Sequence, residues 1–264
     1  MPTPTEFRKH LNKLAVSFLS LIWVSAGMAQ EDPIHLSDTL DVQALYEPIP
    51  SLEIHGETAV SLLEELQTKH YRSVEVDDNF SSAIFDSLID TLDGSHIYFL
   101  RSDIDELSQY RYTLDDSLKS GSVEPGFDVY NTYYKRVLER LIYAINRIEN
   151  DIPDMNFDID EYIQLDREDA PYADSIAELD EIWRLRIKNS VLNLRLTGDE
   201  DEEIKDKLSK RYRNQLSQVL KTNERDIFQT FLSTVAKTVD PHTAYFSPRD
   251  SENFNMGLSL SLQG

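Results

Sequence analysis

Two short polar clusters contain the residue types that hydrolytic enzymes use at their active sites. Ser95 and His96 follow Asp93-Gly94, and a second cluster is Asp240-Pro241-His242-Thr243. Nucleophilic catalysis needs a hydroxyl or thiol, an adjacent base and donors for the oxyanion. Residues adjacent in sequence seldom converge on one reacting atom, and neither cluster has the G-x-S-x-G pattern of a nucleophile elbow. We therefore assign no catalytic residue, and interpret the second cluster as a turn in which proline fixes φ.

No metal or cofactor site is indicated either. The histidines contain no H-E-x-x-H motif and no i, i+4 pair, and the absence of cysteine removes thiolate ligands. Asn156, Asp158 and Asp160 alternate as in a calcium loop, but the places that need Gly and Glu hold other residues in both registers. We interpret this stretch as a solvated acidic loop, and expect no metal, no cofactor and no catalytic residue. The histidines are His10, His35, His55, His70, His96 and His242.

The composition indicates a folded acidic protein. The 264 residues include 13 Tyr and 11 Phe, more aromatic side chains than disordered chains usually carry. The formal net charge is −22, and no basic stripe relieves it, so a polyanion such as DNA or RNA would be repelled. Only 8 Gly are present, and none forms a phosphate-binding loop. These features exclude nucleic-acid partners and give no support to nucleotide binding.

The amino terminus has the pattern of an export signal. Arg8, Lys9 and Lys13 precede an uncharged run over 14–28, and Gly27-Met28-Ala29 places small residues before a cleavage point. The run is short for a membrane span, although an uncleaved anchor helix is the alternative. We expect residues 1–29 to be a signal peptide and the protein to be periplasmic, with at most a peripheral association with the inner membrane.

Helical periodicity dominates the chain that follows. Residues 30–57 contain three prolines and are expected to form an extended lead-in. Apolar spacing predicts helices from Thr58, from Asp77 or Asp78 to Asp93-Gly94, over 102–119, and over 127–148. Gly121, Pro125 and Gly126 are expected to break the chain between the last two. Residues 151–173 are acidic and turn-rich, which predicts a surface connection.

Three more helices are predicted in the second half. One spans 175–196 and ends at Thr197-Gly198, where glycine favours the left-handed conformation. The next extends to about Leu220, with Asp199 and Glu202 at capping-box spacing. The last follows Thr222-Asn223 and stops at Asp240, because proline disfavours the helical conformation in the residue before it. Residues 256–264 alternate apolar and polar side chains, the pattern of a β-strand.

Several of these segments resemble a known family. The sequence over 240–249, DPHTAYFSPR, followed by the strand-like 256–264, resembles the junction of tail-specific (C-terminal processing) proteases, where a helical N-terminal domain meets the PDZ domain. The stretches 92–100 (LDGSHIYFL), 183–189 (WRLRIKN) and 211–214 (RYRN) resemble other signatures of that family. The resemblance covers most of the chain after the signal.

The resemblance implies an all-α, multi-helix N-terminal domain over 58–250, with 251–264 beginning the junction to a PDZ domain. In this family a Ser/Lys pair in a later domain cleaves envelope proteins, whose apolar C-terminal tails the PDZ domain grips by strand addition. The chain ends where that domain would begin, so we expect no catalytic Ser/Lys in it, and activity of this chain alone is not implied. A periplasmic adaptor is an implied partner of the helical domain.

Two other functions remain open at this stage. A stand-alone helical periplasmic binding module would agree with the lack of any site in the sequence. A truncated regulator that competes for the adaptor of an intact protease is the second. We expect the chain to be a scaffold part of a serine endopeptidase.

Overall fold

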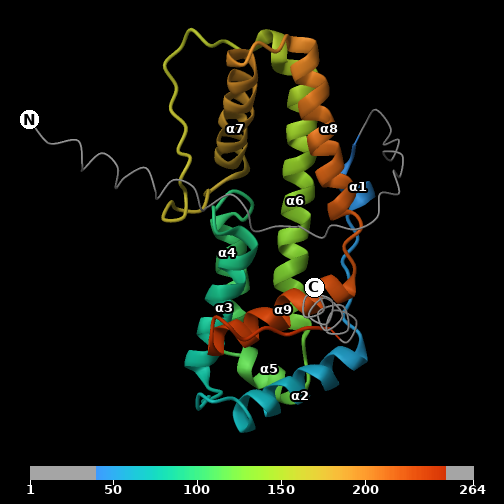
Figure 1. Cartoon of the computed structure of the whole chain (residues 1–264), viewed down its shortest axis with the longest axis vertical. Helices are drawn as coiled ribbons and strands as arrows, with labels where there is room; N and C mark the ends of the chain where they lie inside the picture. Colours follow the sequence, from blue (N-terminus) through green and yellow to red (C-terminus); the bar gives the residue numbers. More distant parts are fainter. Residues whose placement is uncertain (1–39, 248–264) are drawn as a thin grey trace, which may run out of the picture. The chain divides into compact units, whose positions relative to one another are not determined.

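The computed structural model describes residues 40–247, and these residues form helices joined by turns, with no β-strand among them (Figure 1). The fold class expected from the sequence, all-α, is confirmed. The predicted signal peptide and the predicted strand over 256–264 lie outside the described residues. The helices are α1 (Val42–Leu45), α2 (Glu53–Thr68), α3 (Asp78–Asp93), α4 (Arg101–Leu107), α5 (Leu114–Ser120), α6 (Glu124–Asp151), α7 (Ile176–Leu196), α8 (Asp201–Val219) and α9 (Glu224–Val239), with 3-10 turns at Ser108–Tyr110 and Ile152–Asp154.

Side-chain caps begin three of the long helices. Asp77 accepts hydrogen bonds from the free N–H groups of α3, Ser175 does so for α7, and Asn223 for α9. At the other end of α7, Gly198 adopts a φ of 94°, which an L side chain would resist. The predicted starts of these three helices and the predicted ends of α3, α7 and α9 are confirmed.

The predicted single helix over 102–119 is wrong. The chain forms α4, a 3-10 turn and α5 instead. A residue outside 102–119 stabilises the start of α5: the Ser81 hydroxyl accepts the Leu114 N–H at 2.8 Å. A partner on α3 thus satisfies a helix-start donor, which the local apolar spacing does not reveal.

The expected break at Pro125 and Gly126 is also wrong, because both residues lie in the first turn of α6. The first four N–H groups of a helix have no partner inside it, so proline costs nothing there. Gly126 allows a close approach: a Cβ at this position would lie 2.6 Å from the Phe231 ring of α9.

Two further helix starts differ from the prediction. The helix expected from Thr58 begins at Glu53, where His55 Nδ1 accepts the Leu52 N–H at 3.1 Å, and a short α1 precedes it in the segment expected to be extended. The Asp199–Glu202 capping box is absent. Asp199 instead accepts a hydrogen bond from Lys207 at 2.7 Å, and α8 begins at Asp201.

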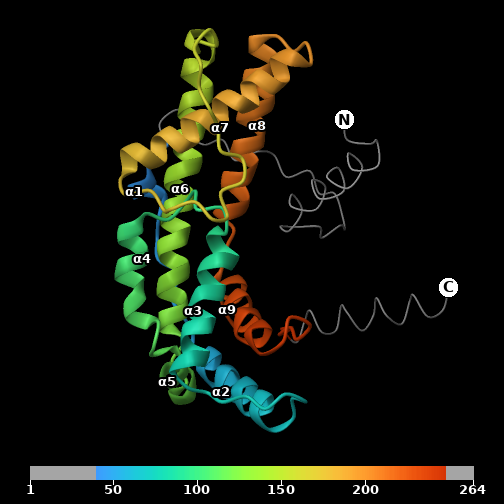
Figure 2. The same ribbon diagram turned by 90° about the vertical axis from the view of Figure 1, so that its left-hand side faces the viewer.

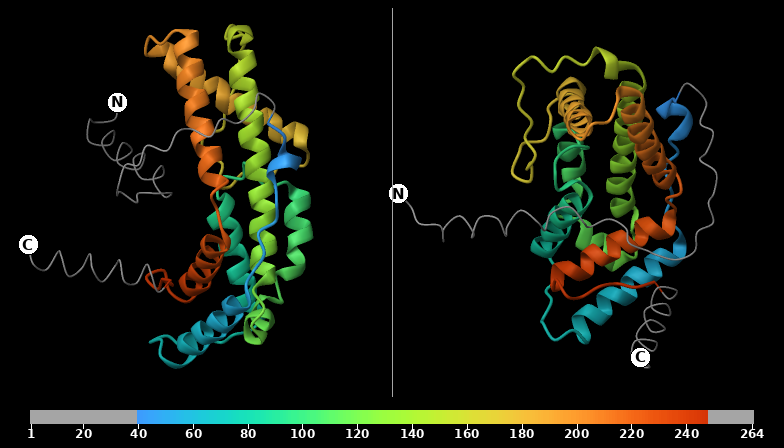
Figure 3. Two further views of the ribbon diagram at one scale, coloured as in Figure 1. Left: turned by 90° about the vertical axis from the view of Figure 1, so that its right-hand side faces the viewer. Right: turned by 45° about the horizontal axis from the view of Figure 1, so that its top comes forward.

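The buried side chains form two core clusters that share α6. Figures 2 and 3 show α6 as the long helix between them, with α7 and α8 beside one half of it and α2, α3, α5 and α9 near the other. The α9 cluster joins the first half of α6 to α2, α3, α5 and α9. The α7–α8 cluster joins the second half of α6 to α7 and α8. Central members are Ile84, Phe85, Leu88, Phe127, Phe231 and Leu232 in the α9 cluster, and Leu138, Ile145, Ile148, Trp183, Ile187 and Leu208 in the α7–α8 cluster.

Among residues 40–247, none of the helices combines the length and the apolar composition that a membrane span requires.

Candidate functional site

The turn after α9 is bound to the segment after α2 by five side chains, which we call the junction clamp: Asp240, His70, Tyr71, Arg72 and Thr243. Both segments follow the carboxyl ends of helices that contact each other. The predicted turn at 240–243 is confirmed, since the Thr243 N–H donates to the Asp240 carbonyl at 2.9 Å.

Asp240 is the centre of the clamp. Its side chain is only 4% exposed, and Oδ2 accepts the Tyr71 hydroxyl at 2.5 Å and pairs with Arg72 Nη2 at 3.1 Å. Oδ1 accepts the His242 N–H at 2.8 Å. The Tyr71 hydrogen bond, the His242 N–H and the Arg72 charge together lower the pKa of Asp240 from 3.8 to about 2. The carboxylate therefore remains ionised in ordinary buffers.

Other contacts fix the path of the chain on both sides of Asp240. Arg72 Nη1 donates to the Val239 carbonyl at 3.3 Å, and His70 Nε2 lies 3.0 Å from the Thr243 hydroxyl. Beyond the turn, the Tyr245 ring packs edge-on against Phe228 of α9, with ring centroids 5.8 Å apart. The Ser233 hydroxyl donates to the Tyr245 carbonyl at 3.2 Å. The clamp thus directs residues 241–245 back along α9.

The first polar cluster of the sequence forms a set of buried contacts around Asp93, which we call the knot, although the chain is not threaded through itself. The Asp93 carboxylate is buried and accepts the N–H groups of Ile97, Tyr98 and Phe99, each at 2.9 Å. Burial raises the pKa of Asp93, and these three hydrogen bonds oppose the rise. Trp183 Nε1 donates to the Ile97 carbonyl at 2.7 Å, so two of the family-like stretches contact each other here.

Ser95 and His96 do not form a nucleophile and base. His96 has a φ of 50°, its ring stacks on Tyr172 at 3.9 Å, and Nδ1 contacts the Ala170 carbonyl. Ser95 is exposed, and no hydrogen bond joins it to His96 among the described residues. The knot can fasten the loop before α7 to the end of α3, but it presents no reacting group.

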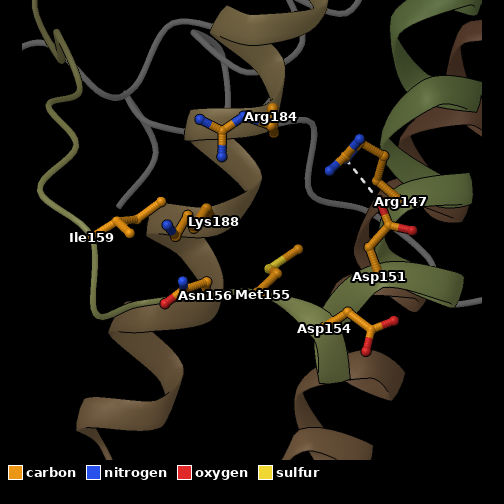
Figure 4. A pocket seen from close by; sticks show the side chains of 8 residues that line it. All are labelled: Arg147, Asp151, Asp154, Met155, Asn156, Ile159, Arg184 and Lys188. Atoms are coloured by element: carbon orange, nitrogen blue, oxygen red, sulfur yellow. Dashed lines mark ion pairs between the residues drawn. The ribbon is translucent and has the colours of Figure 1, made fainter.

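A pocket of about 310 Å³ lies where the loop after α6 passes α7 (Figure 4). Four of its charged side chains are in ion pairs: Arg147 with Asp151 at 3.1 Å, and Arg184 and Lys188 with Glu161 of the predicted acidic loop; Asp154, also at the pocket, is exposed and forms no ion pair among the described residues. The residues that line the pocket include no hydroxyl, thiol or imidazole side chain, so they do not supply the nucleophile and base of a hydrolase. Within residues 40–247, carboxylates and histidines do not gather in threes to hold a metal ion.

Sequence reasoning identified one half of the clamp. The Asp-Pro turn was recognisable, whereas Tyr71 and Arg72 follow α2 in a stretch without a pattern, and Tyr71 lies 169 positions before Asp240. No local signal could have connected the two.

Comparison with known proteins finds similar sequences. The model of the tail specific protease N-terminal domain matches residues 62–249. A tail-specific protease of Haemophilus influenzae is 36% identical over 258 residues, and the match covers 96% of this chain and 36% of that protein. The chain thus spans about a third of the length of this relative.

Proposed function

The chain belongs to the tail-specific protease family and contains its N-terminal domain, and from this we propose that it is the non-catalytic helical scaffold of an exported serine endopeptidase. Its role in this proposal is to give the region that follows a fixed attachment point at residues 240–245. The catalytic Ser/Lys pair and the PDZ domain belong to that following region.

The junction clamp is the observation that carries this proposal. A tail threaded through a protease must reach the cleaving residues at a defined angle, so the domain that grips it needs a rigid base. A nearly buried, ionised carboxylate with three donors resists movement, because any displacement leaves charged groups without partners. The clamp therefore sets the orientation in which the next domain leaves α9.

The same proposal implies a cellular location, a class of substrates and a partner protein. The basic and apolar start of the chain fits export to the periplasm. The substrates are envelope proteins with apolar, unstructured C-terminal tails, and an adaptor protein binds the helical domain.

The first experiment measures the size of the native product in an envelope fraction, with an antibody against residues 60–240. A band several hundred residues longer than this chain supports the proposal. The purified long product should then shorten a reporter with an apolar tail and spare the same reporter with a charged tail. A band of the length of this chain, or an intact apolar reporter, would contradict it.

The clamp is tested in the same assay. Asp240→Asn and Tyr71→Phe each remove the charge-assisted hydrogen bond, so both should lower the cleavage rate several-fold while leaving the helical circular dichroism signal intact. Because the two side chains form one unit, the double variant should lose no more than the stronger single variant. Tyr162→Phe, at a tyrosine that is 88% exposed, is the matched control. If both clamp variants cleave the reporter at the wild-type rate, the positioning role is refuted.

A further inference from the structure

The outer face of α7 carries apolar side chains that the two core clusters do not use. Trp183 and Ile187 belong to the α7–α8 cluster and are 3% exposed or less. Leu185, Leu192 and Leu196 lie seven and four positions apart, so they share one face, about 200° around the helix axis from the buried one. Leu192 and Leu196 are exposed, the latter to 76%. Apolar side chains on two opposite faces are typical of a helix that is covered on both sides.

The loop after α6 covers this outer face only in part. Figure 1 shows the loop running beside α7, on the side away from α6. Glu161 of the loop pairs with Arg184 and Lys188 of the helix. The centre of the Phe157 ring lies 5.1 Å from Lys188 Nζ. These contacts fix the loop to α7, and yet Ile159, between them in the sequence, remains 50% exposed.

A hollow of about 120 Å³ lies between the loop and the outer face of α7. Its apolar lining includes Ile159 and Ile163 from the loop, and Leu185 and Leu192 from the helix. A cavity of about 150 Å³ with aliphatic walls admits a benzene-sized group, so this hollow has room for one branched aliphatic side chain. Such a side chain would remove apolar surface of both the loop and the helix from water, which is favourable.

Carboxylates without a cationic partner border the hollow. Ile159 stands between Asp158 and Asp160, and both of these are exposed and form no ion pair among the described residues. The cation at the hollow, Lys188, is already paired with Glu161. Like charges repel each other, so a positively charged partner would lower the electrostatic energy of this region. The exposed carboxylates of the loop that lack an ion pair within residues 40–247 are Asp154, Asp158, Asp160, Asp166, Glu168 and Asp169.

We propose that this hollow docks a cationic segment of a partner polypeptide. An aliphatic side chain of the segment packs against Ile159 and Leu192, and its positive side chains lie beside Asp158 and Asp160. A second copy of the chain, with its net charge of −22, is repelled by the same carboxylates, as is an anionic lipid surface. That the partner is the adaptor protein rests on the proposed function, whereas the hollow and its charges do not.

The test uses a fluorescein-labelled helical peptide with leucines on one face and lysines on the other. The full chain is titrated into it at about 0.15 M salt, and we expect a saturable rise in fluorescence anisotropy. Two matched peptides replace either the leucines with serines or the lysines with glutamates, and both should bind at least about tenfold more weakly. No binding of the first peptide, or equal binding of the serine peptide through general attraction to an acidic chain, would overturn the proposal.

Variants locate the peptide on the chain. Ile159→Ser and Leu192→Ser should each weaken binding of the leucine–lysine peptide about tenfold. Both side chains are exposed, so the circular dichroism signal should remain that of the wild type. Ile54→Ser, at an isoleucine of α2 that is 57% exposed, is the matched control and should bind like the wild type. Equal affinities of the two isoleucine variants would contradict docking in the hollow.

The carboxylates and the occupant are tested separately. Asp158→Asn combined with Asp160→Asn should weaken binding and reduce its salt dependence. Asp105→Asn combined with Glu106→Gln removes the same charge from exposed positions of α4 and should change neither. A chain that light scattering shows to be a dimer, and that Leu192→Ser makes monomeric, would place a second copy in the hollow and overturn the proposal. Because peptide binding involves no cleavage, its failure is distinguishable from failure of the proposed scaffold role.

Discussion

At the scale of single residues, buried polar groups join segments that are distant in the sequence. Asp93 binds three backbone N–H groups through both of its carboxylate oxygens. An asparagine would direct an amide N–H at one or two of these donors and leave them unsatisfied. Asp93→Asn should therefore lower the free energy of unfolding in urea by about 1–3 kcal/mol. Asp90→Asn, an exposed change of equal charge on the same helix, should cost far less; equal effects would contradict the knot.

His55 is a second buried polar residue, and it makes stability depend on pH. Its ring stacks on Phe228 at 4.2 Å, and Nδ1 accepts the Leu52 N–H, which requires the neutral form. Burial lowers the pKa of His55 from 6.5, while the charge of Glu224 partly opposes this. The unfolded state thus binds the proton more readily, so stability is full above pH 6.5 and falls as pH decreases below it.

Replacing the imidazole isolates this effect. His55→Phe keeps an aromatic ring between Phe127 and Phe228 but cannot titrate. Urea midpoints measured from pH 8 to pH 5 should therefore fall less steeply for this variant than for the wild type. Parallel curves would show that another group causes the dependence.

At the scale of helices, capping residues were predictable because the signal is local: Asp77, Ser175 and Asn223 act within four residues of their own position. At two other helix starts, prediction failed because a residue outside the expected capping motif decides the contact. Ser81 begins α5 from another helix, and Asp199 binds Lys207 rather than capping α8. The clamp and the knot were incompletely predicted for the same reason. The sequence reveals the turn at 240–243 and the cluster at 93–96, but it does not reveal the distant side chains that bind them, Tyr71 and Trp183.

Two glycines separate the cost of a close approach between segments from the cost of backbone strain. A Cβ on Gly56 of α2 would lie 2.1 Å from the carbonyl oxygen of Gly121, a backbone atom that cannot rotate away. Gly198 has open space around it, but its φ of 94° disfavours a side chain. Gly198→Ala should cost about 1 kcal/mol from backbone strain alone. Gly56→Ala should cost clearly more in the same urea titration, and a smaller loss would mean that α2 can shift from Gly121 freely.

At the scale of the whole described chain, α6 makes the two core clusters interdependent. This helix buries Phe127 in the α9 cluster and Ile145 in the α7–α8 cluster, so neither cluster can open without fraying the helix that supports the other. Phe231→Ala, in the α9 cluster, should therefore lower stability by about 3–5 kcal/mol. In a Trp23→Phe background Trp183 reports the other cluster, and its fluorescence midpoint in urea should fall together with the circular dichroism midpoint. A fluorescence transition that keeps its wild-type midpoint would show instead that the clusters unfold separately, and that α6 does not transmit the loss of Phe231 from the α9 cluster to the α7–α8 cluster.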